Sequence, residues 1–84
     1  MDKIKMQHLI KMQHLVEAYL KLEQREEDAF ERYKHFNFKA KEEDRKIYEK
    51  AAEYYGGKFK AFDEAKQVIK EELKEAGYPH TSLL

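Results

Sequence analysis

The sequence predicts an all-α fold, a long antiparallel helical hairpin that assembles into a multi-helix bundle. Two stretches of similar length, residues 3–36 and 40–76, have apolar residues at helical spacing. A short aromatic and basic segment, residues 37–39, separates them and is interpreted as the turn of a single domain, residues 1–84. Because the apolar stripes of two helices cannot enclose a core alone, self-association or partner binding is expected.

The first predicted helix has two adjoining apolar rows with gaps of three or four residues. They comprise Leu9, Met12, Val16, Tyr19 and, beside these, Leu15, Leu22, Ala29, Tyr33 and Phe36. The apolar surface is widest at the N-terminal end, where one partner helix cannot cover it. Between Leu22 and Ala29 the chain is almost wholly polar, and looser packing is expected there.

The second predicted helix keeps its apolar spacing through Gly56-Gly57. Each glycine costs about 1 kcal/mol relative to alanine inside a helix. A broken helix would lose its phase, so one continuous or mildly kinked helix is favoured; the alternative is a turn here, giving three helices. Gly77 suits a left-handed helix end and Pro79 prevents continuation, which leaves residues 77–84 as a loose tail.

Both helices are expected to contribute to a homo-oligomer, a dimer or higher. Its predicted interface residues share an apolar side chain and helical spacing: Met6, Leu9, Ile10, Met12, Val16, Leu20, Tyr55, Phe59 and Phe62. The predicted turn region combines rings with cations and is the candidate surface for a foreign partner. Its residues are Tyr33, His35, Phe36, Phe38, Lys39 and Lys41. Such a mixture can close the end of a hairpin, contact a protein, or bind a nucleotide.

Composition excludes several function classes. The 17 basic and 17 acidic residues give a net charge of zero, which argues against nucleic-acid binding as a function. No window reaches the roughly 18 apolar residues of a membrane span, and no signal peptide is recognisable, so a cytoplasmic protein is expected. The acidic residues Glu42, Glu43 and Asp44 are assigned to the first turn of the second helix, where they would complement its dipole.

No catalytic, cofactor or metal signature is present, and an enzyme is not expected. Gly56-Gly57-Lys58 lacks the other residues of a phosphate-binding loop. His8 and His14 belong to a tandem duplication of six residues, which places them about 120° apart on a helix rather than on one face. The chain has no cysteine, so disulfides and thiolate metal sites are ruled out.

The run from Tyr54-Tyr55-Gly56-Gly57-Lys58-Phe59 to Ala65, continuing to Val68-Ile69, resembles the second helix of small helical-hairpin proteins encoded by phages and mobile elements of low-GC Gram-positive bacteria. The resemblance covers under half of the chain and carries no functional residue across. It implies a small accessory protein that binds a host factor, in the host cytoplasm if the protein is phage-encoded.

The functional hypothesis is therefore a non-enzymatic protein-binding module, in its sharpest form a phage-encoded inhibitor of a host defence or regulatory protein. One alternative is an oligomer that sequesters a nucleotide signal, with tyrosine and lysine or histidine side chains near the turn as ligands. Another is a structural assembly module. Partners expected are a second copy of the chain, a host protein and, in the first alternative, a nucleotide.

Overall fold

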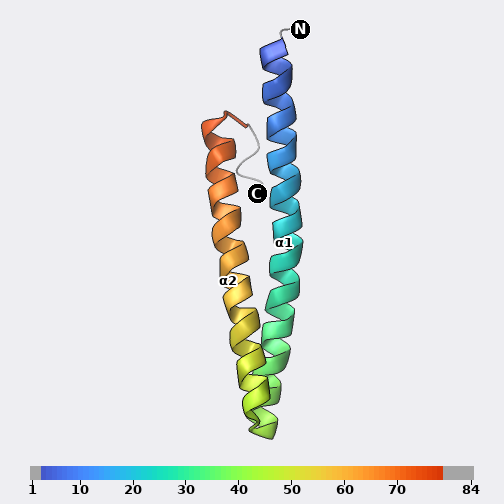
Figure 1. The fold of residues 1–84 in the computed structure, drawn as a ribbon, viewed down its shortest axis with the longest axis vertical. Helices are drawn as coiled ribbons and strands as arrows, with labels where there is room; N and C mark the ends of the chain where they lie inside the picture. Colours follow the sequence, from blue (N-terminus) through green and yellow to red (C-terminus); the bar gives the residue numbers. More distant parts are fainter. Residues whose placement is uncertain (1–2, 79–84) are drawn as a thin grey trace.

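Two long helices packed side by side make up the computed structural model, which describes residues 3–78, with side chains from Met6 onward (Figure 1). Helix α1 (Lys3–Glu43) and helix α2 (Lys46–Glu75) run antiparallel and pack against each other over most of the length of α2. The molecule measures 62 × 19 × 14 Å. The predicted all-α hairpin is confirmed, and the described residues contain no strand.

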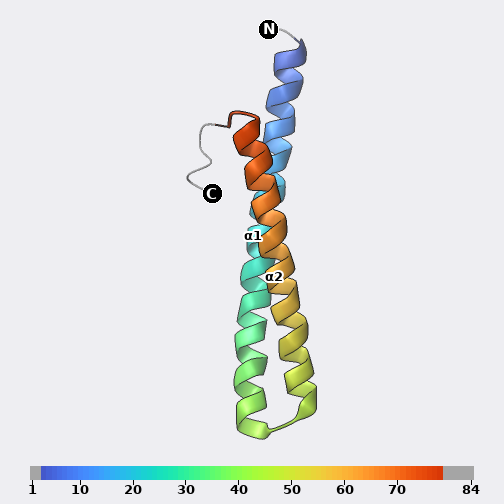
Figure 2. The ribbon, with the colours of Figure 1, turned by 90° about the vertical axis from the view of Figure 1, so that its left-hand side faces the viewer.

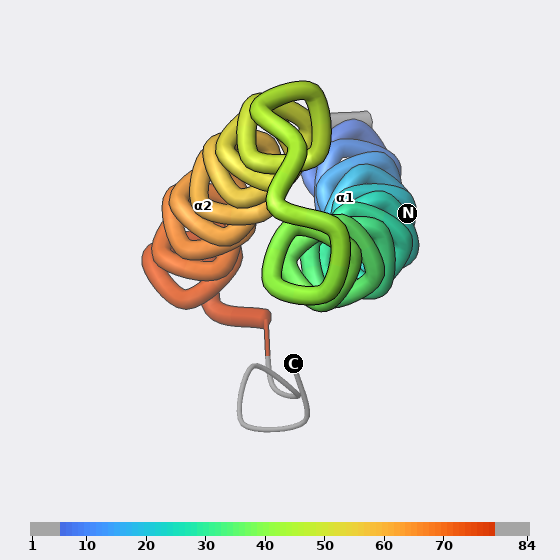
Figure 3. The backbone as a smooth tube through the Cα atoms, turned by 90° about the horizontal axis from the view of Figure 1, so that it is seen from below, coloured from blue at the N-terminus to red at the C-terminus, as the bar shows by residue number. Residues whose placement is uncertain are grey.

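The turn lies at Asp44 and Arg45, so the predicted boundaries, a helix ending at 36 and a turn at 37–39, are wrong (Figure 2). Asp44 has a φ of 48°, in the left-handed region that aspartate tolerates better than most residues. Its N–H donates to the Ala40 carbonyl at 3.0 Å, which closes the last turn of α1. Arg45 is extended and starts α2. Seen from below, the chain crosses directly from one helix to the other (Figure 3).

Helix α1 continues past residue 36 because the regular series of residues that face α2 continues as far as Ala40. Along both helices these positions alternate spacings of four and three, the heptad pattern of a coiled coil, and all of them are buried or half-buried. They are Leu15, Tyr19, Leu22, Glu26, Ala29, Tyr33, Phe36 and Ala40 in α1, Tyr48, Ala52, Tyr55, Phe59, Phe62, Lys66, Ile69 and Leu73 in α2, and the C-cap residue of α2, Ala76.

The new boundaries also change the electrostatics of the turn. Glu42 and Glu43 lie in the last turn of α1, not in the first turn of α2, and therefore do not complement a helix dipole. The acidic residue in the first turn of α2 is Glu49. The N-cap residue Arg45 forms no side-chain capping hydrogen bond.

At the open end of the hairpin, α2 ends as predicted. Gly77 has a φ of 83°, and the N–H of Tyr78 donates to the Leu73 carbonyl at 2.9 Å, as in a Schellman motif. A ring nitrogen of His8 lies 3.0 Å from the Ala76 carbonyl, joining α1 to this end. Residues 77 and 78 are thus ordered by the cap, and the rest of the expected tail, residues 79–84, lies outside the described residues.

Helix α1 is longer than its partner and extends beyond it (Figure 1). It has 41 residues and α2 has 30, a difference of 11. At 1.5 Å per residue, this difference corresponds to about 16 Å of helix. The overhang includes Met6, which no residue of α2 faces.

Helix α2 is continuous through Gly56-Gly57, as favoured from the sequence. The two glycines have different surroundings. A Cβ at Gly56 would lie 3.2 Å from Cδ2 of Tyr33, whereas a Cβ at Gly57 would meet nothing within 4 Å. Gly56 thus admits the Tyr33 ring close to the backbone, and Gly57 has no such packing role.

Replacement of these glycines should therefore have unequal effects. Gly57→Ala is expected to raise the free energy of unfolding by about 1 kcal/mol, because alanine has the higher helix propensity. Gly56→Ala should raise the free energy of unfolding clearly less, since the new methyl group crowds Tyr33. Urea denaturation at one fixed protein concentration measures both. Equal gains would show that Tyr33 places no restriction on Gly56.

Candidate functional site

The six residues predicted for partner binding lie in the last turns of α1, and the structure divides them into two groups. Tyr33 and Phe36 face α2. The Phe36 ring is nearly parallel to that of Tyr55, at 5.6 Å between centroids and 5° between planes, and it lies 6.3 Å from Tyr48. These two predicted contact residues therefore help hold the hairpin together.

The other four are distributed around the outside. Phe38 is 60% exposed. His35 and Lys41, three residues before and after it, are exposed on neighbouring positions of the helix surface. We call these three residues the Phe38 patch. Lys39 is half-buried and lies on a different side of α1.

Apolar side chains form a second exposed surface near the N-terminal end of α1. Leu9, Met12, Val16 and Leu20 follow one another at spacings of three and four, and we call them the N-terminal row. Leu9 and Leu20 are each 49% exposed, and the other two are half-buried. Three members of the row line a predominantly apolar groove of about 520 Å3, which Tyr78 also borders. The row therefore offers an apolar surface that the described residues cover only in part.

Met6 and Ile10, also predicted for the oligomer interface, are 50% and 47% exposed near the N-terminal end of α1. Tyr55, Phe59 and Phe62, the other residues predicted for the oligomer interface, face α1 within the same hairpin. Phe59, for example, packs on Phe30 with ring centroids 5.0 Å apart. Each of these three rings is only half-buried, so an edge stays accessible.

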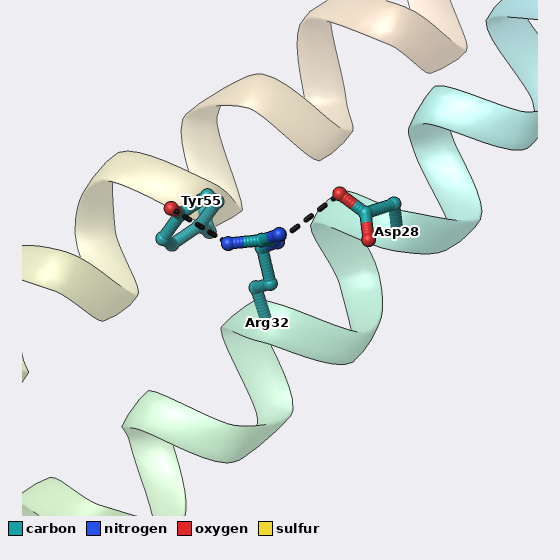
Figure 4. Close-up of polar contacts among 3 residues, drawn as sticks. All are labelled: Asp28, Arg32 and Tyr55. Carbon is teal, nitrogen blue, oxygen red and sulfur yellow. Dashed lines mark hydrogen bonds and ion pairs between the residues drawn. The ribbon is translucent and has the colours of Figure 1, made fainter.

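An exposed polar cluster connects the helices near Tyr55 (Figure 4). The Nε of Arg32 donates to Asp28 at 3.1 Å, and its Nη1 donates to the Tyr55 hydroxyl at 3.4 Å. The hydrogen bond to Tyr55 and the charge of Asp28 raise the pKa of Arg32 further above its usual value. Exposed pairs of this kind add little stability, so the effect of the cluster is to orient the Arg32 and Tyr55 side chains.

A charged pair occupies the hairpin interface. Nζ of Lys66 donates to Oε1 of Glu26 at 3.0 Å, and the two side chains are only 11% and 14% exposed. The Lys66 ammonium also lies 5.3 Å from the centroid of the Tyr19 ring, a residue that is 2% exposed. The second carboxylate oxygen of Glu26, Oε2, is buried and has no hydrogen-bond partner in the described part of the chain.

The pair keeps Lys66 charged. Burial by itself lowers the pKa of Lys66, but the hydrogen bond to Glu26 and the attraction of Tyr19, Glu26 and Glu23 outweigh it, and the pKa is raised overall. A raised pKa in the folded state means that this contribution to stability is fully present below the unfolded value of about 10.4. It is lost as the pH rises through the folded-state pKa.

The apolar pattern of the sequence does not predict this pair and indicates loose packing in the polar segment between Leu22 and Ala29. Glu26 and Lys66 both sit at heptad positions, between Leu22 and Ala29 and between Phe62 and Ile69. Because both residues are charged, they do not belong to an apolar stripe. The alternating four-three spacing was the signal that could have found them.

Among the described residues, no group of three or more histidine, aspartate or glutamate side chains is placed to hold a metal ion. Neither helix, over its described length, is apolar enough to span a membrane. Comparison of the chain with protein-family models, curated proteins and solved structures finds no match.

Proposed function

We propose that the chain is a non-enzymatic protein-binding module that works as a homo-oligomer of hairpins. The observation that supports this is the N-terminal row, an apolar surface with two leucines that are half exposed. Exposed apolar residues in contiguous rows are typical of protein interfaces, whereas scattered ones need no explanation. The occupant we assign to the row is a second copy of the chain.

The total surface area is consistent with such an assembly. The chain exposes 6777 Å2. A compact monomer of 10.2 kDa exposes about 5,300 Å2 by the usual scaling with mass. The excess, about 1,500 Å2, follows from the elongated shape of 62 × 19 × 14 Å, which leaves room for the roughly 800 Å2 that each partner contributes to a standard interface. Pairing of two hairpins into a four-helix bundle would place the N-terminal row of each copy against the other.

The overhang of α1 supports the same assignment, in which the partner is a second copy of the chain. Met6, in the overhang, is 50% exposed, and Ile10, which lies close to the contact of His8 with the end of α2, is 47% exposed. An isolated helix of this length is marginally stable in water, so contact with another helix would stabilise it. A second hairpin can supply that helix.

The surface we assign to a foreign partner is the Phe38 patch. An exposed aromatic ring with cations around it matches a partner pocket that is apolar at its centre and acidic at its rim. The resemblance to hairpin proteins of phages and mobile elements supports the further proposal that this partner is a host defence or regulatory protein, which binding inhibits. In that case the protein acts in the host cytoplasm.

Affinity capture with a double variant tests this assignment. Tagged wild-type protein is expected to retain a specific protein from a host lysate, and Phe38→Ala with Lys41→Glu should retain at least about tenfold less, because it removes the ring and reverses a charge. The control, Gln67→Ala with Lys60→Glu, makes comparable changes at exposed positions of α2 and should capture normally. Equal capture by both variants would contradict the assignment. A hairpin that captures nothing would instead be a structural assembly module.

A further inference from the structure

We propose that the middle of the hairpin carries a binding site for a compact organic anion with a planar ring, that is, a ligand of the nucleotide class. The site is an open groove of about 610 Å3 between α1 and α2. The residues that matter are Lys21, Arg25 and Asp28 from α1, and Tyr55, Lys58 and Phe62 from α2. This groove lies on the opposite side of the α1–α2 interface from the N-terminal row, so the inference is independent of the proposed function.

The groove carries an excess of positive charge in a chain whose net charge is zero. Lys21 and Arg25 are exposed, stand four residues apart on α1, and form no ion pair or hydrogen bond with any described residue. Lys58 lines the groove from α2, with its Nζ 4.7 Å from the centroid of the exposed Tyr54 ring. The acidic residue of the groove, Asp28, is already paired with Arg32 at 3.1 Å (Figure 4). Three cations therefore remain without an anionic partner, which favours a ligand with two or three negative charges.

The base of the groove suits a ring. Tyr55 and Phe62 are half-buried there, and the small side chain of the buried Ala29 leaves room above them. The Tyr55 ring is already covered, by the parallel Phe36 ring at 5.6 Å and by the Arg32 guanidinium at 5.6 Å from its centroid, so the ring of the groove on which a ligand would stack is Phe62. An aromatic ring next to cations is the arrangement that binds a base by stacking and its phosphates by charge.

The size of the groove favours a small molecule over a polymer. Its volume lies within the roughly 300–1,000 Å3 of ligand pockets. From Lys21 to Asp28 the groove extends over two helical turns, about 10 Å. A nucleic-acid strand would need cations along a much greater length. The groove also lies apart from the residues near the turn that the sequence suggests as nucleotide ligands.

Isothermal titration calorimetry with three probes tests the proposal. ATP should bind saturably to the full chain. Inorganic tripolyphosphate should bind at least about tenfold more weakly because it cannot stack, and adenosine should bind at least about tenfold more weakly because it lacks the charges. Equal affinities for ATP and tripolyphosphate would overturn the proposal, since charge alone would then account for binding. The absence of saturable ATP binding would overturn it as well.

Matched variants locate the site. Arg25→Gln and Lys58→Gln should each weaken ATP binding about tenfold, whereas Lys60→Gln, an exposed position of α2 outside the groove, should leave it unchanged. Circular dichroism confirms that each variant stays helical. Equal losses in all three variants would contradict the location. A glutamate-rich peptide that binds more tightly than ATP would assign the groove to an acidic protein segment and overturn the nucleotide assignment.

Discussion

Lys66→Met is expected to lower the free energy of unfolding by about 3 kcal/mol, a large share of the roughly 5–15 kcal/mol that stabilises a domain. The substitution removes the cation and leaves the Glu26 carboxylate, 14% exposed, without its charged partner. One of the oxygens of that carboxylate already lacks a hydrogen bond in the described structure. Chemical denaturation at fixed protein concentration measures the loss.

Two further variants separate the buried pair from ordinary surface charge. Lys34→Met breaks the Lys34–Glu31 pair, which is 2.8 Å long but has side chains that are 51% and 71% exposed, and should cost about 1 kcal/mol or less. Glu26→Leu combined with Lys66→Met removes both charges and should recover most of the stability. If Lys66→Met lowers the free energy of unfolding no more than Lys34→Met does, the Glu26–Lys66 pair is solvated and does not stabilise the interface between the helices.

The paired variant Leu9→Glu with Leu20→Glu is expected to reduce the assembly to monomers. Both leucines are half exposed in the hairpin, so the substitutions should leave its helices intact. In an oligomer they would place like charges in an apolar contact, which costs several kcal/mol per unpaired buried charge. Sedimentation equilibrium measures the mass, and circular dichroism checks the helix content.

A second double variant with the same change of charge serves as the control. Ala61→Glu with Gln67→Glu also adds two negative charges, at exposed positions of α2 away from the N-terminal row, and should keep the mass of the wild type. If the leucine variant keeps that mass too, the contact lies elsewhere on the hairpin. If it unfolds, the two leucines contribute to the hairpin itself.

The hairpin could be predicted from the sequence because its physical cause is periodic. Apolar residues recur along both helices, and Gly77 followed by Pro79 marks the end of α2 clearly. The phase of the pattern across Gly56-Gly57 also predicted correctly that α2 is continuous.

The position of the turn could not be predicted in the same way. No glycine or proline marks it, and Asp44 adopts the left-handed conformation instead. Rings and cations at Phe38 and Lys39 suggested an irregular segment, but Phe36 packs on Tyr55 and keeps this segment helical. Tertiary packing thus decided what local composition left ambiguous.

The candidate sites were predicted in part. The exposed apolar positions Leu9 and Leu20 follow from helical spacing, since a row that lies beside the hairpin interface has no partner in the same chain. The buried pair of Glu26 and Lys66 and the basic groove were not predicted. Both depend on which residues of α2 face which residues of α1, and this register follows only once the turn is correctly placed at residue 44.

Multi-angle light scattering of the wild-type chain at high micromolar concentration tests self-association most directly. The chain has a mass of 10.2 kDa, and we expect a mass of at least twice that value. Dilution should shift the mass toward that of one chain, because association depends on concentration. A mass of 10.2 kDa at the highest concentration would contradict the proposal that hairpins pair through the N-terminal row.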